Sequence, residues 1–432
     1  MKTNVMSIMH NNKIKYFFLI FISAILLMPT PLQSLLGDFL ESLIQQSIPN
    51  EFLFILELEL VVLAIMFFIM IFKNEIQAEL INFIKVVATF MVFILHTSNY
   101  VTYAKGIASG SIFSNAYMRF LYMPAYSAVA VFFFLSGYLT ISSLSKHEFS
   151  LHSVLNFYKK KLLNVFVPTT FIIILMNVFV YPDFLKNHSE FLALWFMLKY
   201  RAWPGTNAIG VTWYISTLMS LYILAPLIFF VIQKMNKKLL QISFFIILIA
   251  GFLYRLRGHL LSIDWAIWQE YTYMPFDKNL DLFILGGIIY KLSKQFNYLQ
   301  ASKQASKQAI TTVFVYILMF YIVFNALTYH RYWNFIIGPS IYALILSGML
   351  LFYDRNNFMD IAHKWKCKET ISYLASISFY FYLFHSLVLE NLYKFMPVAF
   401  NNINLLYFQF LIVAGIITTI LASIFTYGVK RI

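Results

Sequence analysis

Residues 84–98 read IKVVATFMVFILHTS, an apolar stretch that holds a lysine near its start and a histidine near its end. A segment of this kind is suited to a membrane, where ionisable groups are costly and need a specific reason to be present. The interpretation of these two residues therefore depends on the class of protein that surrounds them.

The composition indicates a membrane protein. Hydrophobic residues make up 61% of the 432 residues and charged residues only 12%, whereas soluble domains contain about 25% charged residues. Apolar runs long enough to cross a hydrocarbon core of about 30 Å as a helix recur along the chain. We therefore expect an all-α fold, a polytopic bundle of membrane helices.

The apolar runs predict about twelve transmembrane helices, divided into an extra pair within residues 1–80 and a ten-helix core in residues 81–432. Basic residues are roughly twice as numerous in the segments that this order places inside as in those outside, which predicts that both termini are cytoplasmic. The net charge of +14 follows mostly from this topology, so nucleic acid is not an expected partner. The predicted spans are 16–36, 52–72, 81–103, 125–144, 165–181, 211–232, 239–254, 276–293, 309–329, 332–353, 371–389 and 404–427.

Lys85 and His96 lie about three helical turns apart, roughly 16 Å along one face of the third span. Lys85 then lies at the cytoplasmic boundary and His96 beyond the midplane. A neutral imidazole with a free lone pair is what a general base needs near neutral pH. Two simpler interpretations remain open: Lys85 as a snorkelling anchor, and His96 as a hydrogen-bonding contact between helices.

A second histidine and a Ser-Gly pair occur at comparable positions in other spans. The segment ISFYFYLFHSLVLE (377–390) places His385 at a depth similar to that of His96, and AVAVFFFLSGYLT (128–140) contains Ser136 and Gly137. The serine is a candidate for the same site. Small-residue packing between helices is an equally good explanation of the pair.

Two aspartates lie at the outer mouth of the eighth span. Asp277 and Asp281, in PFDKNLDLFILGG, are spaced so that they share one helical face. They are candidates for orienting a histidine or for binding a sugar hydroxyl, and a solvated helix cap is the alternative.

These segments, taken in order, resemble the acyltransferase type 3 family, integral membrane enzymes that O-acylate sugars of surface polysaccharides and glycolipids. The resemblance covers residues 81 to about 427. It is carried by the basic residue and histidine of the third span and by four further segments: VFFFLSGYL (131–139), TWYISTLMSLYILAPLI (212–228), LDLFILGGIIY (280–290) and ISFYFYLFHSLVLE (377–390).

The resemblance implies an O-acyltransferase, with acetyl-CoA as the expected donor, a saccharide hydroxyl as acceptor and no metal. The residues that it singles out are His96, His385 and Ser136 for catalysis; Lys85, Lys159, Lys160 and Lys161 for the acyl-CoA; and Asp277, Asp281 and Trp213 for the acceptor. One departure concerns the family's cytoplasmic Arg-x-x-Arg pattern, which reads Lys161-Leu-Leu-Asn164 here. Lysine attracts a phosphate as a point charge but lacks the bidentate fork of arginine.

The expected location is the bacterial inner membrane, with the membrane, an acyl-CoA and a glycan or glycolipid as partners. An exporter of polysaccharide or acyl groups is the alternative function, in which the two histidines would relay protons. A non-catalytic scaffold would account for the composition but would leave the histidines without a role.

Overall fold

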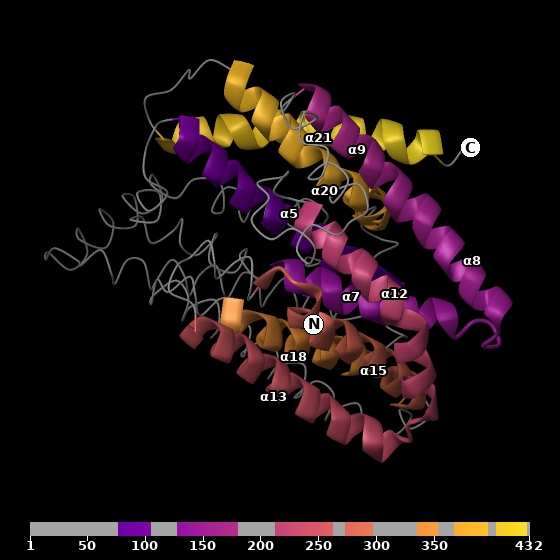
Figure 1. Cartoon of the computed structure of the whole chain (residues 1–432). Helices are drawn as coiled ribbons and strands as arrows, with labels where there is room; N and C mark the ends of the chain where they lie inside the picture. Colours follow the sequence, from indigo (N-terminus) through magenta and orange to yellow (C-terminus); the bar gives the residue numbers. More distant parts are fainter. Residues whose placement is uncertain are drawn as a thin grey trace, which may run out of the picture. The chain divides into compact units, whose positions relative to one another are not determined.

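The computed structural model describes residues 77–104, 128–179, 212–261, 273–296, 335–352, 367–395 and 403–429. All of them belong to the compact unit Asn74–Ile432. Every regular element in these ranges is helical, which confirms the predicted all-α class (Figure 1). The elements are α5 (Gln77–Ala104), α7 (Ala128–Leu144), α8 (Leu151–Lys161), the π-helix η2 (Leu162–Phe166), α9 (Val167–Phe179), α12 (Thr212–Lys234), α13 (Lys237–Leu261), the 3-10 helix η5 (Phe276–Lys278), α15 (Leu280–Phe296), α18 (Gly338–Phe352), α20 (Cys367–Phe395) and α21 (Ile403–Val429).

Five of the described helices contain segments long and apolar enough to cross a membrane: Leu80–Val101, Trp213–Lys234, Lys237–Gly258, Glu369–Lys394 and Gln409–Gly428. Ala128–Leu144 and Gly338–Leu351 are shorter apolar helices. The chain is thus a multi-pass membrane protein. The predicted spans 16–36, 52–72 and 309–329 lie outside the described residues, so the total of twelve and the cytoplasmic termini stay predictions.

Large apolar side chains on the outer helices are exposed, as a lipid-facing surface requires. On α13, Phe245, Ile246 and Ile249 are each more than half exposed, and on α21 the same holds for Ile412 and Ile416. Patches of this extent are rare on soluble monomers. These two helices therefore present one face to lipid.

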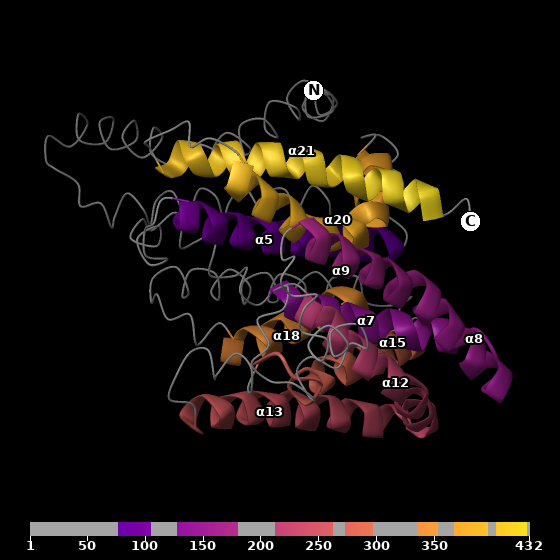
Figure 2. The same ribbon diagram turned by 45° about the horizontal axis from the view of Figure 1, so that its top comes forward.

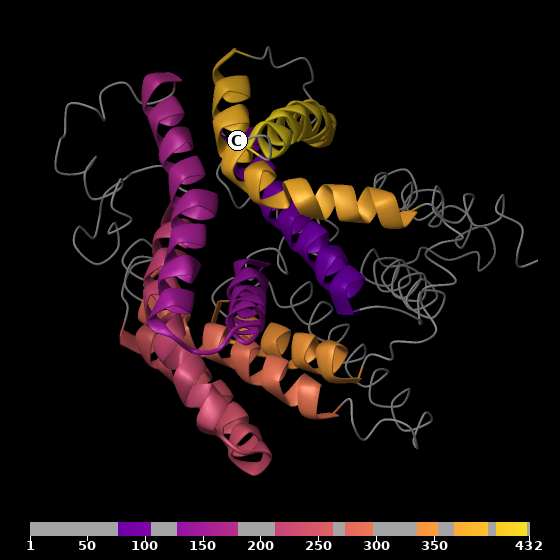
Figure 3. The same ribbon diagram turned by 90° about the vertical axis from the view of Figure 1, so that its right-hand side faces the viewer.

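The described helices form two groups that meet at α7. In one group, α20 packs against both α5 and α21; in the other, α15 packs against α7, α12, α13 and α18. Figure 2 shows the first group above the second, and α7 contacts α5 across the boundary. In Figure 3, α7 is seen nearly end-on, with the α8–α9 helix on one side and α5 on the other.

Two glycines allow α7 and α15 to approach closely. A Cβ atom on Gly137 would overlap the carbonyl oxygen of Phe283, and one on Gly286 would overlap the carbonyl oxygen of Phe134. Small residues at such crossings let helix backbones approach in a membrane. The packing interpretation of Gly137 is therefore confirmed.

The helical run 151–179 consists of α8, η2 and α9 and begins well before the predicted span at 165–181. Its π-helix ends two residues before Pro168. Proline has no N–H to donate to the carbonyl four residues earlier, and its ring crowds that carbonyl. The wider π turn accommodates this irregularity within a continuous helix.

The C-terminal half of α12 carries a matching irregularity where α8 packs against it. Pro226 lies inside α12 and cannot donate to the carbonyl of Tyr222. At the next residue, the carbonyl oxygen of Ile223 accepts a hydrogen bond of 2.8 Å from the Tyr158 hydroxyl of α8. A side-chain donor thus joins the two helices beside the proline.

Candidate active site

The two histidines predicted at similar depth come together in the structure. Helices α5 and α20 pack along each other, and the rings of His96 and His385 have their centroids 5.0 Å apart at an interplanar angle of 82°. His385 is 1% exposed, whereas His96 is half-buried. His96 is therefore the member of the pair that a substrate can reach more easily.

The hydrogen bonding of His385 defines which of its nitrogens is free. Its Nδ1 atom lies 2.6 Å from the carbonyl oxygen of Tyr382. A carbonyl only accepts hydrogen bonds, so Nδ1 carries the proton, and in the neutral ring Nε2 then holds the lone pair. Nε2 is buried and has no hydrogen-bond partner among the described residues. An unused acceptor thus lies beside His96.

Aromatic rings enclose the histidine pair and connect it to α12. Phe93 packs edge-on against His385 at 6.3 Å. The Tyr382 ring lies 5.5 Å from His385 and 5.2 Å from Tyr214 of α12. The site is therefore lined by α5, α12 and α20, three helices that are far apart in the sequence.

Ser136 belongs to this network through a tyrosine. Its hydroxyl lies near that of Tyr214, whose ring packs against Tyr382, and Tyr382 in turn packs against His385. Neither tyrosine was predicted from the sequence as part of the site. The available signals were their positions: Tyr214 directly follows Trp213, and Tyr382 lies three residues before His385.

Trp213 lies in the wall behind this network. It is 6% exposed, and its ring packs 5.1 Å from that of Tyr273 and 6.1 Å from that of Phe133. Its expected contact with the acceptor stays a prediction.

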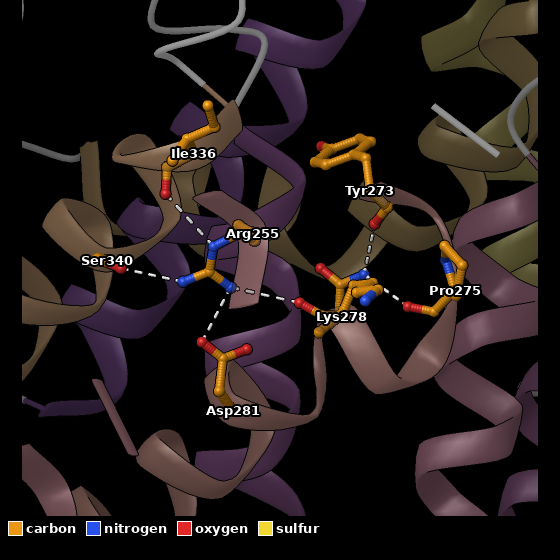
Figure 4. A network of polar contacts seen from close by, with 8 residues as sticks. Arg255, Tyr273, Pro275, Lys278, Asp281, Ile336 and Ser340 are labelled. Atoms are coloured by element: carbon orange, nitrogen blue, oxygen red, sulfur yellow. Dashed lines mark hydrogen bonds and ion pairs between the residues drawn. The ribbon is translucent and has the colours of Figure 1, made fainter. Parts of the chain in front are cut away.

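Both aspartates contact residues of α13, and Figure 4 shows the contacts of Asp281. Asp281 forms an ion pair of 2.9 Å with Arg255, which is 3% exposed. Arg255 also donates to the Ser340 hydroxyl at 2.9 Å and to the carbonyl oxygens of Lys278 and Ile336 at 3.3 and 3.4 Å. This cluster joins α13, α15 and α18, and its arginine was not predicted from the sequence.

Asp277 makes a separate contact at the same end of α15. It accepts a hydrogen bond of 2.8 Å from the Tyr254 hydroxyl. Oδ1 of Asp281 is buried without a hydrogen-bond partner among the described residues. Binding of a sugar hydroxyl by either aspartate stays a prediction, and their observed contacts are between helices.

The lysines predicted to bind the donor separate into two sets. Lys161 lies with its Nζ atom 3.9 Å from the centroid of the Tyr222 ring and close enough to Lys85 for their charges to repel. Neither lysine forms an ion pair with a carboxylate among the described residues. Lys159 and Lys160 are instead exposed on α8. Lys85 and Lys161 together are therefore a candidate anion-binding site.

No group of three His, Cys, Asp or Glu side chains suited to a metal occurs within the described ranges. The site therefore contains two adjacent imidazoles, an aromatic enclosure and, about 16 Å along α5, a pair of cations. This arrangement suits proton transfer beside an anionic substrate of extended shape.

The comparisons with known proteins agree with this chemistry at the level of the family. A family model described as an acyltransferase domain matches residues 79–427, most of the chain. No curated protein and no solved structure matches the chain. The span of the match, together with the paired histidines, shows that the chain belongs to the acyltransferase type 3 family of membrane acyltransferases.

Proposed function

We propose that this protein transfers an acetyl group from cytoplasmic acetyl-CoA to a hydroxyl of a cell-surface or lipid-linked saccharide, in the bacterial inner membrane. The observation that carries the proposal is the contact between His96 and His385, with a free acceptor nitrogen on the buried partner. General bases positioned in this way speed proton transfer by roughly 10²- to 10⁴-fold.

In the proposed step, His96 takes the proton of the acceptor hydroxyl while the hydroxyl oxygen attacks the thioester carbonyl. The carbon–sulfur bond then breaks, an oxygen ester forms, and the leaving thiolate of CoA receives the proton from His96. When substrate binds, Nε2 of His385, which is unpaired among the described residues, takes the N–H of His96 as a hydrogen bond. This bond holds the other nitrogen of His96 ready as the base and disperses the charge of the imidazolium.

Lys85 and Lys161 support the choice of an acyl-CoA as donor. Two cations held near each other without a described carboxylate partner are suited to a phosphate group. The rise from Lys85 to His96, about 16 Å along one helix, fits a donor whose phosphates and thioester are joined by a long arm.

The acceptor class is tested by NMR of the cell-surface polysaccharide from strains that carry wild-type protein or His96→Ala. We expect ester-linked acetyl resonances to disappear in the His96→Ala strain while the amount of polymer stays the same. Unchanged esters together with a loss of exported polymer would contradict the proposal and support an exporter.

A further inference from the structure

The segment 273–279, directly before α15, is a tight strap that is closed by its own last residue. The side-chain amide of Asn279 donates to the carbonyl oxygens of Tyr273 at 2.8 Å and Pro275 at 3.1 Å (Figure 4). An amide nitrogen carries two hydrogens, so both are used. Asn279 is 3% exposed. An asparagine directly before a helix more often caps that helix with its side-chain oxygen, so the donation back into the strap is a specific feature of this segment.

Two neighbouring helices hold the strap in place. On α12, the buried Thr217 donates its hydroxyl hydrogen to the carbonyl oxygen of Met274 at 2.5 Å. On α13, Arg255 donates to the carbonyl oxygen of Lys278 at 3.3 Å. Buried backbone carbonyls that lie outside regular helices need partners of this kind. The strap is therefore fixed at its start by α12 and near its end by α13.

The fixed strap presents one aromatic ring to the wall of the active site. The Tyr273 ring lies 5.1 Å from that of Trp213 and 4.5 Å from that of Phe335, three residues before α18. From Trp213 the ring contacts continue through Tyr214, at 6.4 Å, to Tyr382, the neighbour of the buried histidine. The position of the strap therefore sets the position of Trp213 in this wall.

The strap lies at the end of α12 that we predict to face outward. Thr217, which bonds to the strap, is one turn after Trp213, at the start of α12. In the proposed reaction the saccharide approaches from this side. Water is the competing nucleophile for a thioester, and a wall held in one position keeps it out of the space that the acceptor hydroxyl occupies.

We propose that the 273–279 strap closes the acceptor side of the active site to water, with Thr217 and Asn279 as its positioning residues. This inference rests on the proposed acetyl transfer and adds the element that decides between a sugar hydroxyl and water. When water reacts instead, its oxygen attacks the thioester carbonyl and the carbon–sulfur bond breaks. Acetate forms, and the thiolate of CoA takes the proton. Thr217 and Asn279 act on this choice through Tyr273 and Trp213.

The full chain in lipid nanodiscs, which expose both faces, tests the inference with radiolabelled acetyl-CoA and the de-O-acetylated surface polysaccharide of the host strain. The measured quantity is the ratio of acetyl transferred to acetate released, which does not depend on the amount of folded protein. Thr217→Val keeps the size of the side chain but loses the bond to Met274, and it should lower this ratio about fivefold. Asn279→Leu loses two bonds and should lower the ratio further.

Thr217→Ser keeps the hydroxyl and should give the wild-type ratio. Thr418→Val is the matched control, because Thr418 is a buried threonine of α21 whose hydroxyl has no hydrogen-bond partner among the described residues. It should also leave the ratio unchanged. A wild-type ratio in Thr217→Val, or an equal fall in Thr418→Val, would overturn the inference and leave the proposed transfer standing. A wild-type protein that transfers no acetyl group to the polysaccharide would overturn both.

Discussion

The Nδ1 atom of His385 is held 2.6 Å from the carbonyl oxygen of Tyr382, one turn earlier in the same helix. This single bond fixes the side on which the neutral ring carries its proton, and it directs the lone pair to Nε2. The backbone of α20 thus fixes the tautomer of the buried member of the histidine pair, and His96 is the neighbouring imidazole.

Replacement of His385 should slow the chemical step without weakening the binding of the acetyl-CoA donor. In His385→Ala we expect kcat to fall by roughly 10²- to 10⁴-fold, since the partner that orients His96 is gone. KM for acetyl-CoA should change little, because Lys85 lies toward the other end of α5 and Lys161 of α8 lies beside it. Steady-state kinetics in proteoliposomes measure both. The neighbouring buried Ser386→Ala serves as control, and an equal loss there would point to a packing defect.

Lys161 should act on donor binding. Lys161→Met removes one of the two cations at the predicted phosphate site, so we expect KM for acetyl-CoA to rise about tenfold with kcat nearly unchanged. Lys160→Met loses the same charge from the exposed face and should raise KM less. A KM that is the same in the wild type and Lys161→Met would exclude Lys161 from the donor site.

The close crossing of α7 and α15 predicts that Gly→Ala substitutions there lower the stability more than Gly→Ala substitutions elsewhere. Gly137→Ala and Gly286→Ala should each lower the stability by about 1–3 kcal/mol or more, because the added methyl group meets backbone that cannot move without separating the helices. Thermal unfolding in detergent measures the effect. Gly428→Ala, which would meet nothing within 4 Å, and Gly415→Ala, with its first neighbour at 3.6 Å, are the controls.

Variants of the buried ion pair between Arg255 and Asp281 distinguish a structural role of Asp281 from a role in acceptor binding. Asp281→Asn leaves Arg255 without its carboxylate, and we expect a loss of about 3–5 kcal/mol of stability. Arg255→Met/Asp281→Leu removes both charges and should recover part of that loss. If Asp281 also binds the sugar, the double variant will show a raised KM for the acceptor at temperatures where it stays folded.

The sequence was sufficient to predict the membrane class and the similar depth of the two histidines, because hydropathy and helical rise determine these directly. It could not predict which lysines of α8 face inward, since only the packing of α8 on α12 decides this. The partner of Asp281 was also missed. Arg255 lies on a different helix, and only the packing of α13 on α15 brings the two together.

The central claim is that His96 activates the acceptor hydroxyl, and the most direct measurement is the rate of labelled acetyl transfer by His96→Ala in proteoliposomes. The account predicts a fall of roughly 10²- to 10⁴-fold, with acetyl-CoA still bound at its normal affinity. Transfer at the wild-type rate by a folded His96→Ala protein would contradict it.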